Sequence, residues 1–437
     1  MVPLAYVSAD VETVCFYKEI DYEKKRKCTV TNTLKEDKAM SIQTIRKIKK
    51  CSNTLYRAIS LTAITTLPAM AEITLYESDN TSVKVDVLLN TFYVNADDDV
   101  ADKQESRVKI GFLPNILGFN FSNQMSNGLK LGGRVSFWTS SSDSRRQGLS
   151  GVESQSSLTI GHIDTRQIYG TVEGNFGEIL FGKDFGLFAR SNILKDEMLL
   201  GFGNNGLFVE NSFVSYGNIG AGYLYPVPTS QITWRSKELF GDFNVAVGIQ
   251  DPEKLASGGQ SEESAPRLEG ELSYDLGIGS AWLGFTSQES ESLVGGEDIE
   301  STGVSYGVQL NAGGFRATAS GFTGEGLGGL VNTANILSDS IVDAEGDERE
   351  SSGYLGQVSY TAGRNRFVVS YGHNEVECDS GGDDYYDSDV KGVVWFHDFT
   401  EKGNLKLVAE YNVSEVSVSG DKLADVGTVA VGMVLTF

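Results

Sequence analysis

Hydrophobic and polar residues alternate with period two along most of the chain from residue 82 onward. In the last such stretch Val429, Val431 and Met433 fall on one side, while Thr428 and Ala430 fall on the other. Period two is the signature of a β-strand with one buried or lipid-facing side. About sixteen short runs of this kind can be marked, which predicts an all-β protein built from antiparallel strands.

The connections between these runs alternate in length. Long connections rich in Asp, Glu, Ser and Gly are predicted near 97–106, 139–162, 185–229, 251–266, 289–301, 323–350, 375–389 and 414–425. Tight turns are predicted between them at 174–177, 237–242, 276–280, 312–314, 362–365 and 400–404. This alternation indicates an up-and-down meander with turns at one rim and loops at the other. Residues 114–127 are the exception, because Pro114 cannot donate to a strand ladder and predicts an irregular strand or a longer connection.

The chain has no run of the roughly 18 apolar residues that a membrane-spanning helix needs, so a bilayer could be crossed only by strands in a closed barrel. A β-sandwich or a β-solenoid would show the same alternation. A solenoid should carry a fixed sequence repeat, and a sandwich of this length should divide at linkers; we find neither. The predicted fold is a transmembrane antiparallel up-and-down β-barrel of about 16 strands with a long inward-folded loop.

Residues 1–71 differ in character from the rest. Basic residues follow Met40, then an apolar run over 58–67, and then Pro68-Ala69-Met70-Ala71, a small-x-small cleavage signal. We therefore predict a secretory signal peptide that begins near Met40 and is cleaved after Ala71, leaving 72–437 as one barrel domain. Residues 1–39 are either a mis-assigned start or a long leader, and a short buried helix over 58–71 is the competing interpretation.

Charge and cysteine content narrow the function further. The first 71 residues carry 12 of the 36 Lys and Arg and 7 of the 59 Asp and Glu, so residues 72–437 carry 24 basic and 52 acidic residues, a net charge of −28. Such a chain would repel nucleic acid, and no basic stripe offsets the surplus. Cys378 is the one cysteine beyond residue 71, which excludes a disulfide framework and a zinc site built on cysteines. These features are typical of the bacterial cell envelope.

Enzymatic and metal-binding interpretations rest on few residues. His162, His373 and His397 are the three histidines, and no nucleophile motif frames them, so we expect rim histidines and no enzyme or resident cofactor. Carboxylates cluster at 97–99, 343–350 and 377–389 without EF-hand spacing. Solvated loop faces are the default, and Ca²⁺ or Mg²⁺ bridging these loops to lipopolysaccharide is a secondary use.

The connection over 185–229 contains too many apolar residues for a loop in water, among them Phe185, Phe188 and Phe202. We expect it to fold inward against the barrel wall and narrow the lumen. A plug, or a cap on the rim, is the alternative.

Several segments together resemble the general, sixteen-stranded trimeric porins of Gram-negative bacteria. They are Ser106–Phe112 with Asn127–Lys130, Arg166–Gly170 with Gly174–Lys183, Thr233–Arg235 with Leu239–Phe243, and the terminal Phe437. The similarity is spread over 82–437. The resemblance implies a homotrimer in the outer membrane, in contact with lipid and lipopolysaccharide, with a third loop that forms the pore constriction.

The resemblance also implies constriction residues. Arg107, Arg166 and Arg235 fall where the family places a basic cluster on the barrel wall, with Lys183 as a neighbouring candidate. Asp196 and Glu197 fall on the constriction loop that would face them, and a second loop carboxylate of the family aligns with Gly201.

The function predicted from these observations is passive diffusion of small hydrophilic solutes and ions, with weak cation preference. A channel selective for sugars or small anions, with Phe185, Phe188 and Phe202 lining a track, is the alternative within the class. An outer-membrane adhesin or structural barrel is the alternative from another class.

Overall fold

The computed structural model describes residues 72–140, 163–203, 215–237, 242–252, 261–262, 264–292, 298–328, 341, 348–377 and 385–437. The predicted leader lies outside this range and remains a prediction. The described residues form one antiparallel sheet and one short helix, α1 (Arg190–Leu194). They contain no helix long and apolar enough to cross a bilayer.

The strands follow one another along the chain. They are β1 (Glu72–Glu77), β2 (Thr81–Asp98), β3 (Lys103–Lys109), β4 (Asn115–Gln124), β5 (Lys130–Thr139), β6 (Ile163–Gly174), β7 (Gly177–Phe185), β8 (Pro228–Arg235), β9 (Phe243–Gln250), β10 (Ser261–Glu262), β11 (Arg267–Asp275), β12 (Gly279–Ser292), β13 (Ile299–Ala312), β14 (Phe315–Glu325), β15 (Glu350–Ala362), β16 (Asn365–Val376), β17 (Tyr386–Asp398), β18 (Leu405–Val418) and β19 (Asp421–Thr436).

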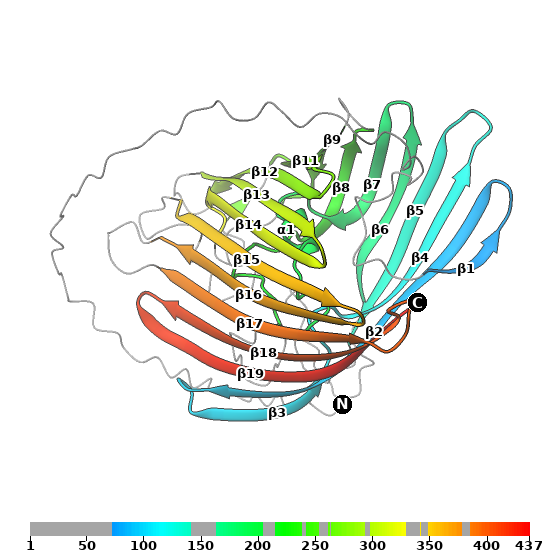
Figure 1. Ribbon diagram of the computed structural model, residues 1–437. Coiled ribbons are helices and arrows are strands. Elements are labelled where there is room, and N and C mark those ends of the chain that lie inside the picture. Colours follow the sequence, from blue (N-terminus) through cyan, green and yellow to red (C-terminus); the bar gives the residue numbers. More distant parts are fainter. Residues whose placement is uncertain are drawn as a thin grey trace, which may run out of the picture. The chain divides into compact units, whose positions relative to one another are not determined.

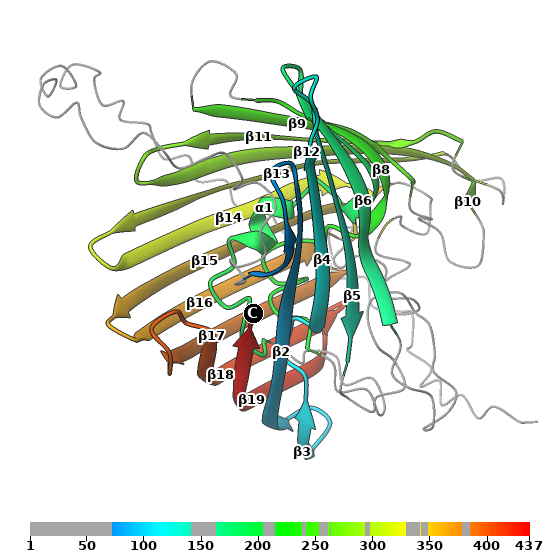
Figure 2. The ribbon, with the colours of Figure 1, turned by 90° about the vertical axis from the view of Figure 1, so that its right-hand side faces the viewer.

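The sheet closes on itself at β2 (Figures 1 and 2). One edge of β2 pairs with β19 and the other with β3 and β4, in registers that include Tyr93↔Val431 and Val85↔Phe119. β3 and β4 pair with successive parts of the same edge of β2 and therefore count as one strand of the barrel. With the short strands β1 and β10 left out, the closed barrel has sixteen strand positions. The predicted closed barrel of about 16 strands is confirmed.

Pro114 lies in the break between β3 and β4, as its missing N–H predicts. The irregular strand or longer connection predicted over 114–127 is otherwise wrong, because β4 pairs with β2 and β5 without a register shift. Hydrogen bonds also join β2 to the last residue of the sequence. The amide of Val87 donates to the carbonyl of Phe437 at 2.8 Å, and the amide of Phe437 donates to the carbonyl of Val87 at 2.9 Å. The last residue of the sequence therefore lies within the ladder that closes the barrel.

Tight turns gather at one rim of the barrel, which we call the turn rim, and the opposite end is the loop rim. Five of the six predicted tight turns lie at the turn rim, between β6–β7, β11–β12, β13–β14, β15–β16 and β17–β18. Residues 238–241 of the sixth, between β8 and β9, lie outside the described residues. The long connections predicted at 97–106 and 414–425 are wrong. The strands continue through these acidic stretches, leaving turns at 99–102 and 419–420, because a strand that extends beyond a membrane can carry charged residues on both faces.

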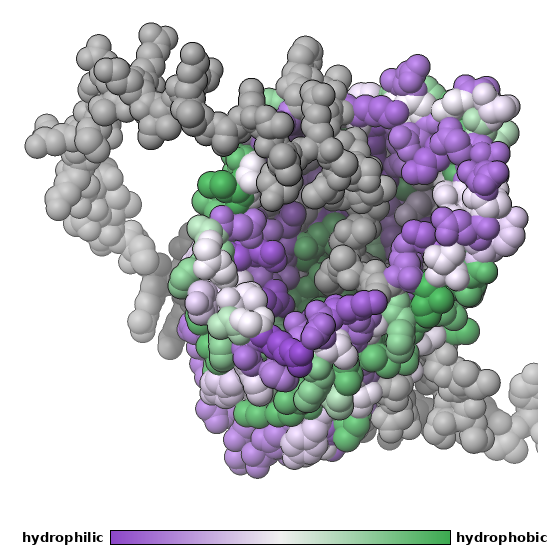
Figure 3. All heavy atoms as spheres, turned by 45° about the vertical axis from the view of Figure 1, so that its right-hand side comes forward, coloured by the Kyte–Doolittle hydropathy of each residue, from purple (hydrophilic) through white to green (hydrophobic). Residues whose placement is uncertain are grey.

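The period-two pattern predicts the two faces correctly. Val429, Val431 and Met433 are 43–47% exposed on the outer face, whereas Thr428 and Ala430 are fully buried on the inner face. The outer face carries apolar side chains with aromatic residues near the turn rim, such as Phe315 and Tyr360, whose tilted rings have centroids 4.4 Å apart. Figure 3 shows hydrophobic residues on the outside of the strands and hydrophilic residues around the hollow. This arrangement suits a barrel in lipid with a polar interior.

Candidate functional site

The described residues of the β7–β8 connection, 186–203 and 215–227, lie inside the barrel (Figure 2). Helix α1 packs against β13 of the inner wall. Apolar residues of the connection, including Met198, Leu199 and Phe202, join one buried cluster with inward residues of β2 and β15–β19. The predicted inward fold is confirmed. It buries the apolar side chains of the connection, which the hydrophobic effect favours.

Side chains of the wall anchor the start of this connection. The backbone amides of Leu187 and Phe188 both donate to Oε2 of Glu269 on β11, at 2.5 and 3.0 Å. The indole of Trp282 on β12 donates to Oδ1 of Asn192 in α1 at 2.7 Å. Hydrogen bonds to a buried carboxylate are among the stronger ones in proteins, so the loop is fixed to this wall.

A second carboxylate anchors the middle of the connection. The amides of Phe202 and Gly203 donate to the two oxygens of Glu410 on β18, each at 2.8 Å. A Cβ added to Gly201 would lie 2.3 Å from Oε2 of the same Glu410. At the position where the family resemblance implies a loop carboxylate, this chain has a glycine packed against a carboxylate of the wall.

Asp196 is buried among neutral partners. Its Oδ2 accepts from the hydroxyl of Tyr223 at 2.7 Å and from Asn218 at 2.9 Å, and its Oδ1 accepts from Gln357 at 2.7 Å. Burial raises the pKa of Tyr223 well above its usual value, and the charge of Asp196 raises it further. Asp196 therefore links the first part of the β7–β8 connection to its last part and to β15.

Glu197 meets basic residues of the wall that the sequence analysis missed. Its carboxylate pairs with Arg366 on β16 at 3.0 Å and with Arg316 on β14 at 3.4 Å, and it accepts from Gln309 at 3.1 Å. Burial and the neighbouring charge of Arg316 lower the pKa of the adjacent Lys195. The period-two pattern places Arg316 and Arg366 on the inner face, but no local signal says which loop residue they meet.

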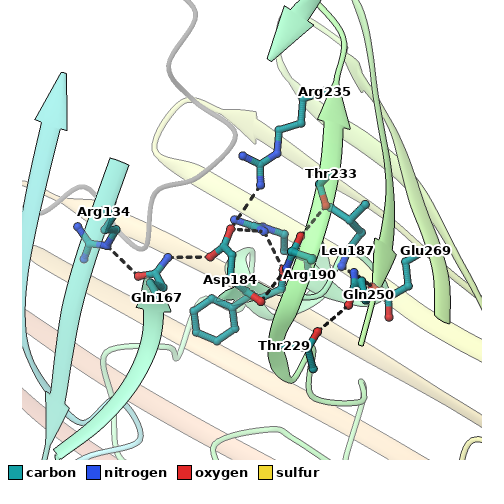
Figure 4. Close-up of polar contacts among 12 residues, drawn as sticks. Arg134, Gln167, Asp184, Leu187, Arg190, Thr229, Thr233, Arg235, Gln250 and Glu269 are labelled. Carbon is teal, nitrogen blue, oxygen red and sulfur yellow. Dashed lines mark hydrogen bonds and ion pairs between the residues drawn. The ribbon is translucent and has the colours of Figure 1, made fainter. Parts of the chain in front are cut away.

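A separate charged network crosses the wall formed by β5–β8 (Figure 4). Asp184 on β7 pairs with Arg190 at 3.1 Å and with Arg235 at 3.4 Å, and it accepts from Gln167 at 2.9 Å. Arg134 on β5 donates to the other end of Gln167 at 2.8 Å. Buried charges of opposite sign thus neutralise each other along this wall.

The two remaining predicted arginines lie on the inner face in different surroundings. Arg107 on β3 is half-exposed and pairs with Glu105 at 2.9 Å. Arg166 on β6 pairs with Asp164 at 2.8 Å, donates to the hydroxyl of Tyr225 at 2.9 Å and stacks on Trp138 at 4.8 Å. Arg107, Arg166 and Arg235 therefore each pair with different carboxylates.

The predicted constriction role of Lys183 is wrong. Lys183 pairs across the ladder with Ile168, which is 44% exposed on the outer face, and with Ser230 on the same face. Cross-strand partners share a face of the sheet, so Lys183 points out of the barrel. Asp184, the next residue along β7, takes the inward position.

The loop aromatics do not form a track. Phe188 and Phe202 are 7% and 0% exposed, and Phe202 packs against Phe92 with ring centroids 6.0 Å apart. Phe185 packs edge-on against Trp138 at 5.7 Å. These rings fill the space between loop and wall.

Comparisons with known proteins agree with this geometry. A family model described as Gram-negative porin matches residues 58–418. No curated protein matches the sequence.

Solved structures of three outer-membrane proteins are similar in fold. The outer membrane channel DcaP of Acinetobacter baumannii is 16% identical, covers 83% of this chain and 99% of its own, and has a TM-score of 0.60. OmpF of Salmonella typhi is 12% identical, with 84% of this chain and 100% of its own covered and a TM-score of 0.55. OmpT of Vibrio cholerae is 15% identical, with 83% of this chain and 99% of its own covered and a TM-score of 0.53. With a closed sixteen-position barrel, an inward loop and a family match over most of its length, the chain belongs to the Gram-negative porins, the diffusion channels of the outer membrane.

Proposed function

We propose that small hydrophilic solutes and ions cross this porin by passive diffusion, through the part of the lumen that the β7–β8 connection leaves open. The observation that carries the proposal is the anchoring of that connection to Glu269, Gln357 and Glu410 of the inner wall, which narrows the barrel at a fixed place. Polar walls and a fixed narrowing favour hydrophilic solutes, because such solutes can replace their hydrogen bonds to water with hydrogen bonds to the channel wall.

The charge arrangement supports weak ion selectivity. The basic residues predicted on the inner wall each have a carboxylate partner: Arg107 with Glu105, Arg166 with Asp164, and Arg235 with Glu178 and Asp184. Pairing removes most of the net field of each cation. The surplus of acidic residues over 72–437 then biases entry towards cations, modestly and in a salt-dependent way.

Planar lipid bilayers with a tenfold KCl gradient test this function. We expect open channels and a small reversal potential of the sign for K⁺ preference. A reversal potential for Cl⁻ contradicts the selectivity, and folded protein without conductance favours an adhesin or structural barrel.

Sugars and small organic anions added to the same bilayers test the selective-channel alternative. We expect no concentration-dependent block, because Phe188 and Phe202 are buried and unable to line a binding track. Saturable block by one solute class contradicts passive, unselective diffusion.

We also propose a homotrimer in contact with lipid and lipopolysaccharide. One solved neighbour, OmpT of Vibrio cholerae, is described in a trimer form. Single-channel steps in groups of three, with a heat-labile band of triple mass on a gel, would support the trimer; single steps from a monomeric band would contradict it.

A further inference from the structure

One cluster outside the lumen combines a histidine with carboxylates. His373 on β16 and Asp387 and Asp389 on β17 lie on the outer face near the loop rim, and their ligand atoms all lie within 4.8 Å of one another. Nδ1 of His373 is 3.5 Å from Oδ1 of Asp389 and 3.9 Å from Oδ2 of Asp387. Register fixes the arrangement, because His373 and Asp389 are direct cross-strand partners.

The separation of Nδ1 of His373 from Oδ1 of Asp389 suits two ligands of one metal ion. Nδ1 is buried and forms no hydrogen bond with any residue that the structure describes. Two ligands at about 2.1 Å from a tetrahedral ion are about 3.4 Å apart, close to the separation of Nδ1 from Asp389. A hydrogen bond between these two atoms would need better alignment than they have.

The other ring nitrogen supplies independent support. Nε2 of His373 faces Oε2 of Glu375 at 3.5 Å, and Glu375 in turn accepts from the hydroxyl of Ser352 at 2.7 Å. A carboxylate at Nε2 favours the tautomer with its proton on Nε2 and a lone pair on Nδ1. This carboxylate–histidine arrangement is the usual outer shell of a metal-binding imidazole.

The remaining surroundings hold the ligands in place. The hydroxyl of Tyr371 donates to Asp389, and the ring of Tyr354 packs on the ring of His373 with centroids 5.2 Å apart. Both tyrosines stand on the same outer face, so the ligands are built on two paired strands and their positions do not depend on a loop.

We propose that His373, Asp387 and Asp389 bind a divalent metal ion of the zinc class at the outer loop rim. One nitrogen and two carboxylate ligands, with water completing the shell, suit a borderline ion such as Zn²⁺. Ca²⁺ takes six to eight oxygen ligands, which this cluster does not offer. Asp387 and Asp389 belong to the acidic stretch 377–389, where the sequence analysis considered Ca²⁺ or Mg²⁺, and at these two residues the zinc-class proposal replaces that expectation. At 97–99 and 343–350 the binding of Ca²⁺ or Mg²⁺ remains a prediction.

Isothermal titration of the folded protein in metal-free detergent buffer tests the proposal, with ZnCl₂ and CaCl₂ in separate runs. We expect one Zn²⁺ per chain, no competition from Ca²⁺, and loss of this binding in His373→Ala and Asp389→Asn. Glu375→Gln should weaken it by about 10–100-fold, as expected for an outer-shell partner.

His397→Ala is the matched control. Like His373, His397 lies on the outer face of the barrel, but it is on β17 and its Nδ1 contacts the amide side chain of Asn365. Heat-modifiable gel migration and unchanged conductance establish that each variant folds. Zn²⁺ binding that survives His373→Ala, that is lost equally in His397→Ala, or that Ca²⁺ displaces, overturns the proposal. None of these results bears on diffusion through the lumen, which the conductance reports separately.

Discussion

At the scale of single residues, this porin uses buried carboxylates of the wall to hold its inward loop. Glu269 and Glu410 each accept two backbone amides from the β7–β8 connection. A buried amide that loses its acceptor costs about 1–3 kcal/mol. These glutamates therefore hold the connection against the wall although neither belongs to it.

We expect Glu410→Ala to loosen the connection without unfolding the barrel. The amides of Phe202 and Gly203 would lose their acceptors, and hydrogen exchange at these two amides should accelerate by about tenfold or more, as a loss of about 1–3 kcal/mol per amide implies. Mass spectrometry of peptides that cover the two residues measures this.

Glu415→Ala is the control on the same strand. Glu415 lies on the outer face in ion pairs with Lys391 and Lys422, which are exposed and contribute little. Unchanged exchange at Phe202 and Gly203 in Glu410→Ala, or equal acceleration in both variants, would show that the carboxylate is not the anchor.

At the scale of elements, the β7–β8 connection fits the wall so closely that some strand positions admit only glycine. Gly372 on β16 faces inward, and a Cβ built there would lie 1.8 Å from the carbonyl oxygen of Ala221. The preceding carbonyl along the connection, that of Gly220, accepts from the hydroxyl of Tyr386 at 3.3 Å. The backbone of the connection at Ala221 thus occupies the space that a side chain at Gly372 would fill.

We expect Gly372→Ala to displace the segment around Ala221, because backbone cannot yield as a flexible side chain can. Single-channel recordings should show altered conductance and more open-channel noise. Gly356→Ala on β15 is the matched control, since its added Cβ would meet nothing within 4 Å. Identical recordings from both variants would mean that the loop does not border the conducting path.

At the scale of the whole molecule, lipid surrounds a closed sheet whose outer face is apolar. Val431 is 43% exposed on the outer face of β19, and Ile278 is 62% exposed in a turn at the turn rim. The cost of a charge depends on depth, being largest at the middle of the bilayer and small at its surface.

Val431→Arg should therefore destabilise the folded barrel by about 2–4 kcal/mol, and Ile278→Arg by about 0–1 kcal/mol. Denaturant unfolding in lipid vesicles measures both. Equal losses would mean that Val431 does not face the bilayer core, and the assignment of outer and inner faces would fail.

The sequence by itself determined the barrel, because period two and alternating turns are local consequences of strand geometry that each segment carries alone. Its apolar residues also showed that the loop over 185–229 must pack against something and favoured an inward fold over a plug or a cap on the rim. Tertiary structure decided what the loop meets: Glu197 contacts Arg316 and Arg366, more than a hundred residues away in the sequence, in place of the predicted Arg107, Arg166 and Arg235. Register decided that Lys183 points outward, since one step along a strand reverses the face. Contacts between distant segments depend on barrel closure, shear and packing, which no local pattern encodes.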